Sequence, residues 1–113
     1  MKISKPFICV AVLTSTSSLF SISSIAGNLE AGRAKAEMMC QTCHGMDGQA
    51  LAPMVAHISG QQEDYLAAQL ENYRSGKRHH EQMTIISQSL TDEDIANLAT
   101  WYSSIKVTIE TPE

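Results

Sequence analysis

The run Cys40-Gln41-Thr42-Cys43-His44 constrains the fold of this 113-residue chain more than any other feature. Two cysteines separated by two residues and followed directly by a histidine form C-x-x-C-H, the attachment motif of c-type haem. Two thiols add across the two vinyl groups of one haem, and the adjacent imidazole reaches the iron as its proximal ligand. The motif therefore predicts one covalently bound haem c, held by Cys40 and Cys43, with His44 on the iron.

Two other uses of a close cysteine pair fit the sequence less well. A zinc site needs four ligands, such as two Cys pairs or one pair with spaced histidines. Here no second Cys pair exists, and His79 and His80 are adjacent. A thioredoxin-like redox pair needs a βαβ setting, whereas no segment has the pattern of a parallel-sheet protein. Haem attachment is the interpretation that the motif favours.

The first 26 residues have the features of an export signal. Lys2 and Lys5 precede the apolar run 7–13, and Ser24-Ile25-Ala26 is a small-x-small cleavage site. A retained membrane anchor is disfavoured because this run is far shorter than the roughly 20 residues that a spanning helix needs. The sequence predicts a cleaved signal peptide over 1–26, a single domain over 27–113 without a transmembrane segment, and a periplasmic location.

Composition limits the partners of this domain and the way it builds a core. The sequence pI of about 5.5 argues against nucleic-acid binding and favours partners that present basic patches. Two Phe, three Tyr and one Trp provide few large side chains for a core. A covalent haem would supply the missing apolar body around which helices pack.

Three segments have the pattern of helices, and none alternates like a strand. Asn28 is a suitable N-cap for the first helix, Gly76 ends the second, and Thr91 followed by three acidic residues caps the third. The segments between them, 44–60 and 76–90, are expected to be loops, and 106–113 a loose tail. The predicted fold class is all-α, with helices over about 29–40, 62–73 and 92–105.

Three longer motifs extend the haem motif: AGRAKAEMMCQTCHGMDG, SGQQEDYLAAQLENYRSGKR and MTIISQSLTDEDIANLATWYSS. Together they resemble the class I cytochromes c, in particular small bacterial monohaem members whose domain also occurs duplicated in periplasmic di-haem cytochromes. The resemblance covers residues 27–104. It implies the class I fold, with three main helices and short helical turns around one haem.

The resemblance also assigns roles to individual residues. Met83 falls where the family places its distal ligand, in the loop before the last helix. Gly32 and Trp101 match the positions at which the first and last helices cross. One residue departs from the family pattern: Ala56 replaces a proline whose carbonyl accepts a hydrogen bond from the proximal imidazole. That bond remains possible for Ala56, but the loop is less rigid.

Other methionines and histidines are alternatives to Met83 as distal ligand. Met54 could offer its thioether to the iron in place of Met83, and His79 or His80 would give a bis-histidine haem. Their charged neighbours place these two histidines on a solvated loop, and His57 is interpreted as a surface residue. Met38 and Met39 are interpreted as packing residues.

Histidine and methionine on opposite sides of the iron leave no position for a substrate. The expected function is single-electron transfer between periplasmic or membrane redox proteins by a monomer or weak dimer that is not an enzyme. Two alternatives stay open. One is a ligand-binding, sensor or peroxidase-like haem protein with an open distal site. The other is a fixed cytochrome subunit of a periplasmic dehydrogenase.

The basic residues Arg74, Lys77 and Arg78 form the one basic cluster of an acidic chain. Cations near the end of a helix are favourable on electrostatic grounds alone. The functional alternative is a docking rim near the haem edge or a contact with a haem propionate.

Overall fold

The computed structural model describes residues 25–113, so the predicted signal peptide over 1–26 lies almost wholly outside the described residues. The described part consists of helices and irregular segments, without a strand, which confirms the all-α prediction. None of its helices is long and apolar enough to cross a membrane. The helices are α1 (Leu29–Met39), α2 (Gln41–His44), α3 (Glu63–Ser75), α4 (Glu81–Gln88) and α5 (Asp92–Ser103).

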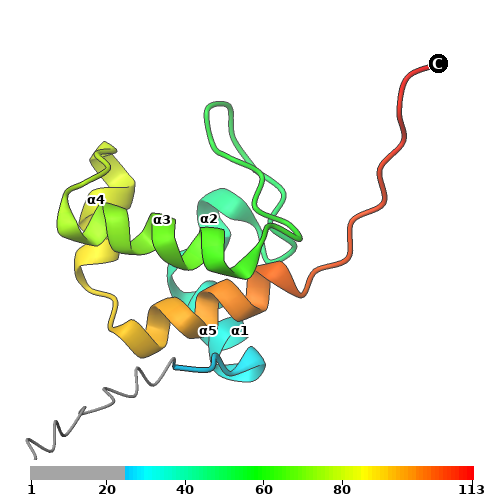
Figure 1. Ribbon diagram of the computed structural model, residues 1–113. Coiled ribbons are helices and arrows are strands. Elements are labelled where there is room, and N and C mark those ends of the chain that lie inside the picture. Colours follow the sequence, from blue (N-terminus) through cyan, green and yellow to red (C-terminus); the bar gives the residue numbers. More distant parts are fainter. Residues whose placement is uncertain (1–24) are drawn as a thin grey trace, which may run out of the picture.

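Helix α5 is the centre of the packing. It lies against α1 on one side and α3 on the other, and α3 also packs on α4. Figure 1 shows this arrangement, with the loop between α2 and α3 projecting from the helices and the C-terminal tail running away from them. The buried apolar residues come mainly from α5 and its neighbours: Ala36, Leu66, Leu90, Ile95, Leu98, Ala99 and Tyr102.

The crossing of α1 and α5 depends on a glycine, as the sequence predicts. A Cβ atom at Gly32 would lie 2.0 Å from the carbonyl oxygen of Asn97 and 3.0 Å from the Cβ of Trp101. The two backbones therefore approach more closely than any side chain at this position permits. The buried amide of Asn97 adds a polar link, because its Oδ1 accepts the backbone N–H of Asn28 at 2.6 Å.

The predicted N-caps of α1 and α5 and the predicted end of α3 are confirmed, whereas α5 ends at Ser103 and not at 105. Asn28 Oδ1 accepts the N–H of Ala31 at the start of α1. Gly76 ends α3 in the left-handed conformation, with φ of 80°. Thr91 and Asp94 form a capping box at the start of α5, in which each side chain accepts the backbone N–H of the other. These contacts satisfy backbone groups that a helix terminus leaves without partners.

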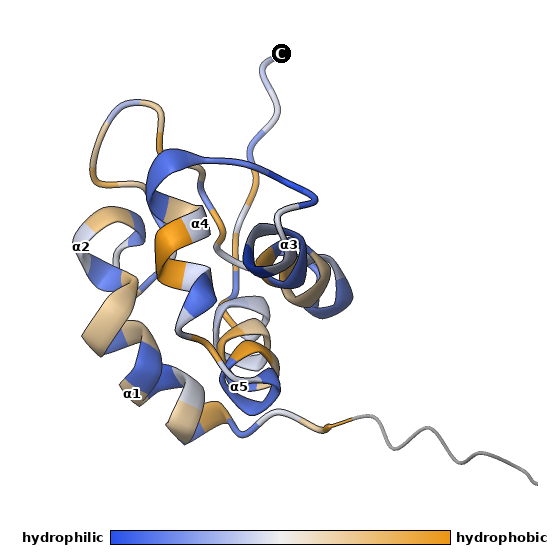
Figure 2. Ribbon diagram, turned by 90° about the vertical axis from the view of Figure 1, so that its left-hand side faces the viewer, coloured by the Kyte–Doolittle hydropathy of each residue, from blue (hydrophilic) through white to orange (hydrophobic). Residues whose placement is uncertain are grey.

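The prediction of a loop over 76–90 is wrong, because α4 forms within it. His80, an unusual capping residue, accepts the N–H of Met83 at its start. Packing on α3 then buries Ser87 and the following Leu90. Figure 2 shows a strongly hydrophobic middle in α4, which corresponds to the Ile85-Ile86 pair of its sequence. Met38 was expected to pack but is 78% exposed, whereas Met39 contacts the core.

Candidate haem site

The cysteine–histidine motif forms a tight turn directly after α1. Cys40 ends α1 and begins α2, and the N–H of His44 donates to the carbonyl of Cys40 at 3.0 Å. Cys40 is half-buried and Cys43 is exposed. One helical turn therefore presents the two thiols and the imidazole from the same short segment.

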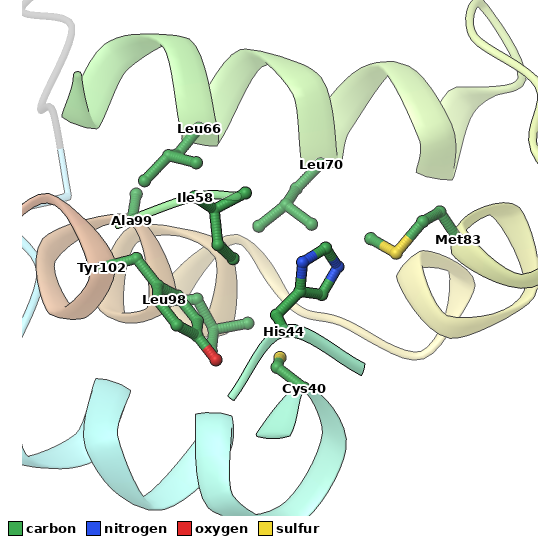
Figure 3. A pocket seen from close by; sticks show the side chains of 9 residues that line it. All are labelled: Cys40, His44, Ile58, Leu66, Leu70, Met83, Leu98, Ala99 and Tyr102. Carbon is green, nitrogen blue, oxygen red and sulfur yellow. The ribbon is translucent and has the colours of Figure 1, made fainter. Parts of the chain in front are cut away.

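An apolar cavity of about 50 Å³, partly open to solvent, lies between this turn and the other helices. Figure 3 shows its side chains, which come from the haem motif, the loop before α3, and helices α3, α4 and α5. Cys43 is not among them. The lining residues are Cys40, His44, Ile58, Leu66, Leu70, Met83, Leu98, Ala99 and Tyr102.

The imidazole of His44 is oriented by the loop that follows it. His44 Nδ1 lies 2.9 Å from the carbonyl oxygen of Ala56, so the tautomer with its proton on Nδ1 donates to that oxygen. The bond expected from the carbonyl at this position is present although alanine replaces proline. It leaves Nε2 without a proton and free to ligate a metal.

Met83 lies across the cavity from this imidazole. Figure 3 shows the thioether of Met83 and the ring of His44 pointing toward one another from α4 and α2. The structure thus brings together Cys40, His44 and Met83, three of the four residues that the sequence singled out. Met83 reaches the cavity from a helix and not from the expected loop.

The alternative ligands lie elsewhere. Met54 is 99% exposed in the projecting loop. His57 accepts the N–H of Ala50 through Nδ1 at 2.9 Å, which stabilises the base of that loop. His79 and His80 are exposed in the turn before α4, outside the lining of the cavity.

Tyr102 is a site residue whose polar role the sequence analysis missed, since it was assigned only to an apolar stripe. Its buried hydroxyl donates to the carbonyl of Gly45 at 3.0 Å, directly after the haem motif. Burial raises the pKa of the nearby Cys40 thiol to about 11, although the Tyr102 hydroxyl and Lys35 act in the opposite direction. A buried tyrosine usually has a hydrogen-bond partner, and this general rule is the signal from which the role could have been predicted.

The basic cluster has structural partners. Arg74, in the last turn of α3, donates to the carbonyl of Leu90 at 3.0 Å and forms an ion pair with Asp92. Arg78 donates to Gln69 at 2.7 Å. The bonds of Arg74 link α3 to the start of α5. The bond of Arg78 links the turn after α3 back to α3, so both guanidinium groups contribute to the fold.

The side chains around the cavity fit a c-type haem. A thiol pair lies in the turn that carries the imidazole, the free ring nitrogen faces a thioether, and the wall between them is apolar. Imidazole and thioether are the axial donors of His/Met cytochromes, and an apolar wall suits a macrocycle.

Comparisons with known proteins agree with this geometry. Residues 27–101 match the family model described as cytochrome C oxidase, cbb3-type, subunit III. Cytochrome c-554(548) of Halomonas halodenitrificans is 44% identical over 82 residues, which cover 70% of this chain and 98% of that protein.

Two solved structures are also similar. Reduced recombinant cytochrome c4 from Pseudomonas stutzeri superposes with a TM-score of 0.67 at 34% identity, over 74% of this chain and 48% of that one. Thiosulfate dehydrogenase from Marichromatium purpuratum gives 0.66 at 32% identity, over 70% of this chain and 19% of that one. The chain thus corresponds to about half of cytochrome c4. By its family match, its identity to a relative of similar length and its fold, the chain belongs to the class I cytochromes c.

Proposed function

We propose that this cytochrome transfers single electrons through one haem c, attached by Cys40 and Cys43 and ligated by His44 and Met83. The observation that supports this most directly is the opposed placement of the His44 ring and the Met83 thioether across an apolar cavity. With His44 and Met83 as its two protein ligands, the haem iron would have no coordination site left for a substrate. The arrangement favours a carrier over an enzyme.

The haem, when bound, supplies a one-electron couple between ferrous and ferric iron. The protein groups set the conditions for that couple. The carbonyl of Ala56 fixes the His44 ring, and the soft thioether of Met83 favours the ferrous state. The wall formed by residues such as Leu66, Leu70 and Leu98 is apolar, so the surroundings of the site are of low polarity. The thioether and the apolar surroundings both favour the ferrous state and so raise the reduction potential, whereas the carbonyl of Ala56 fixes the ring and strengthens it as a donor.

The setting that we propose is the periplasm, after removal of residues 1–26. The basis is the pattern of that segment: two lysines, a short apolar run and a small-x-small site. The acidic composition of the chain favours donor and acceptor proteins with basic surfaces.

A second candidate function is that of a fixed electron-transfer subunit. The similarity to part of thiosulfate dehydrogenase from Marichromatium purpuratum favours it, because that longer chain includes a domain of this fold. Purification from periplasm under mild conditions separates the two functions. A free carrier elutes at the mass of one or two copies of this chain, whereas a subunit co-elutes with a dehydrogenase.

The Met83→Ala variant tests the ligand set. We expect it to keep its haem through acid extraction, because the thioethers do not involve Met83. It should lose the sulfur-to-iron charge-transfer band of the ferric protein, have a lower reduction potential and bind cyanide and carbon monoxide.

The matched control is Met54→Ala, which removes a methionine that is 99% exposed and should leave the band unchanged. If Met83→Ala keeps a native low-spin spectrum while Met54→Ala or His80→Ala loses it, the ligand assignment is wrong. Haem that is released into organic solvent would contradict attachment through Cys40 and Cys43.

A further inference from the structure

The exposed His80 stands at the start of α4, three residues before Met83, whose thioether faces the His44 ring. We propose that His80 is a positioning residue for Met83: its imidazole caps the first turn of α4 and thereby holds the thioether in place across the cavity. The inference rests on the proposed ligation by Met83, and the experiment below separates a failure of one from a failure of the other.

His80 and α4 exchange two hydrogen bonds. The backbone N–H of Met83 donates to His80 Nδ1 at 3.4 Å, and the backbone N–H of His80 donates to Thr84 Oγ1 at 3.0 Å. The backbone of His80 is extended, with φ of −152° and ψ of 133°, as an N-cap requires. The pair is reciprocal in the manner of a capping box. One of its bonds ends on the backbone of Met83 itself.

The ring of His80 is held in this position by α3. Tyr73 meets it edge to face, with 6.5 Å between ring centroids and an angle of 74° between planes. The guanidinium of Arg78 lies 4.8 Å from the centroid of the Tyr73 ring. Arg78 is fixed in turn, because its side chain donates to Gln69 at 2.7 Å and its backbone N–H to Asn72 at 3.0 Å. Contacts from α3 therefore orient the cap of α4.

Helix α4 depends on such a cap more than the longer helices α1, α3 and α5. It has eight residues, a length at which an isolated helix is marginal in water. The β-branched run Thr84-Ile85-Ile86 lowers its helix propensity further, and Ile85 is 67% exposed, so it adds little packing. When the cap is lost, the first turn frays, and that turn contains Met83.

This role differs from that of an axial ligand. The cavity is lined by Met83 and not by His80, and His80 Nδ1 already accepts the N–H of Met83. His80 therefore acts on the iron only through the position of Met83.

The test measures how often the thioether leaves the iron in the ferric holoprotein. Cyanide binds only after Met83 has dissociated, so its binding rate at saturating cyanide reports that opening. Removal of the cap in His80→Ala should speed cyanide binding about fivefold, the effect of a typical cap on a local equilibrium. The sulfur-to-iron charge-transfer band should persist at lower intensity. His80→Asn should bind cyanide at nearly the wild-type rate, because asparagine is a good N-cap.

Asn28→Ala is the matched control. It removes the same kind of cap from α1, where Asn28 Oδ1 accepts the N–H of Ala31, far along the chain from Met83. A general loss of stability would speed cyanide binding in this variant as well, whereas the proposed role leaves its rate unchanged. Thermal unfolding of each variant measures the stability that each cap contributes, and we expect the two losses to be comparable.

Each outcome decides between the two claims. A wild-type rate in His80→Ala, equal acceleration in Asn28→Ala, or no rescue by His80→Asn overturns the positioning role and leaves Met83 as ligand. A wild-type ferric protein without the sulfur-to-iron band overturns the ligation by Met83 itself.

Discussion

Ser87 is fully buried on α4, and its hydroxyl has no hydrogen-bond partner among the described residues. Burial of a hydroxyl without a partner costs free energy that a methyl group does not. We therefore expect Ser87→Ala to raise the free energy of unfolding by about 1 kcal/mol. Ser89→Ala is the control, because Ser89 Oγ donates to the carbonyl of Ile86 at 2.9 Å and its loss should not stabilise. Thermal unfolding of the two variants checks the prediction, and a destabilised Ser87→Ala would contradict it.

Asp94 links stability to pH. Burial alone raises the pKa of its carboxyl, but hydrogen bonds from Lys35 and Thr91 outweigh burial and hold the pKa below its usual value. The stabilisation is therefore complete above the unfolded-state pKa, near 3.9, and is lost as pH falls through the lower folded-state value. Asp94→Asn should be less stable than wild type at pH 7, and the difference should shrink toward pH 3. Urea unfolding across this range measures it, with the exposed Glu93→Gln as control. A difference that stays constant or grows in acid would show that the carboxylate charge is not responsible.

At the scale of helices, α1 and α5 come into close backbone contact where they cross at Gly32. In an exposed helix, replacement of glycine by alanine stabilises by about 1 kcal/mol. Here the added Cβ would lie 2.0 Å from the backbone oxygen of Asn97, so the helices must separate. Gly32→Ala should instead destabilise by about 2 kcal/mol through overpacking. Chemical denaturation measures this change. Ala34→Gly, at an exposed position of the same helix, is the control, because it gives the effect of helix propensity alone. A stabilised Gly32→Ala would mean that the helices do not touch at this point.

The helices that the sequence predicted are those with strong local signals. Thr91 with its acidic turn marks α5, and the left-handed Gly76 marks the end of α3. Helix α4 was missed because it lacks such signals: its N-cap is a histidine, and β-branched residues fill its middle. Its stability comes from packing on α3 and from the cap, and both depend on contacts between segments. Local periodicity contains no information about either.

At the scale of the whole molecule, the site too has a part that depends on neighbouring residues and a part that depends on contacts between distant segments. Only the first part can be predicted from the sequence. The thiol pair and its histidine are neighbours in the sequence, so this part of the site could be predicted from five residues. The bond from His44 to Ala56 and the bond from Tyr102 to Gly45 join residues 12 and 57 positions apart. The first followed only from the resemblance to a family, and the second was missed. Long-range hydrogen bonds of this kind become visible only when the fold brings the segments together.

The last prediction concerns the haem as part of the core. The buried apolar residues are few, and several of them, including Leu66, Leu98, Ala99 and Tyr102, also line the cavity. A domain of this size buries a modest share of its surface, so helices that face a cavity instead of a macrocycle lose much of their packing energy. The double variant Cys40→Ser, Cys43→Ser, produced without haem, should lose its cooperative thermal transition and near-ultraviolet circular dichroism and should bind a hydrophobic dye. Each single serine variant retains one thioether and should keep a cooperative transition at a lower temperature. A haem-free double variant that unfolds cooperatively at the wild-type temperature would show that the helices pack without the macrocycle, and that the cavity is a preformed pocket.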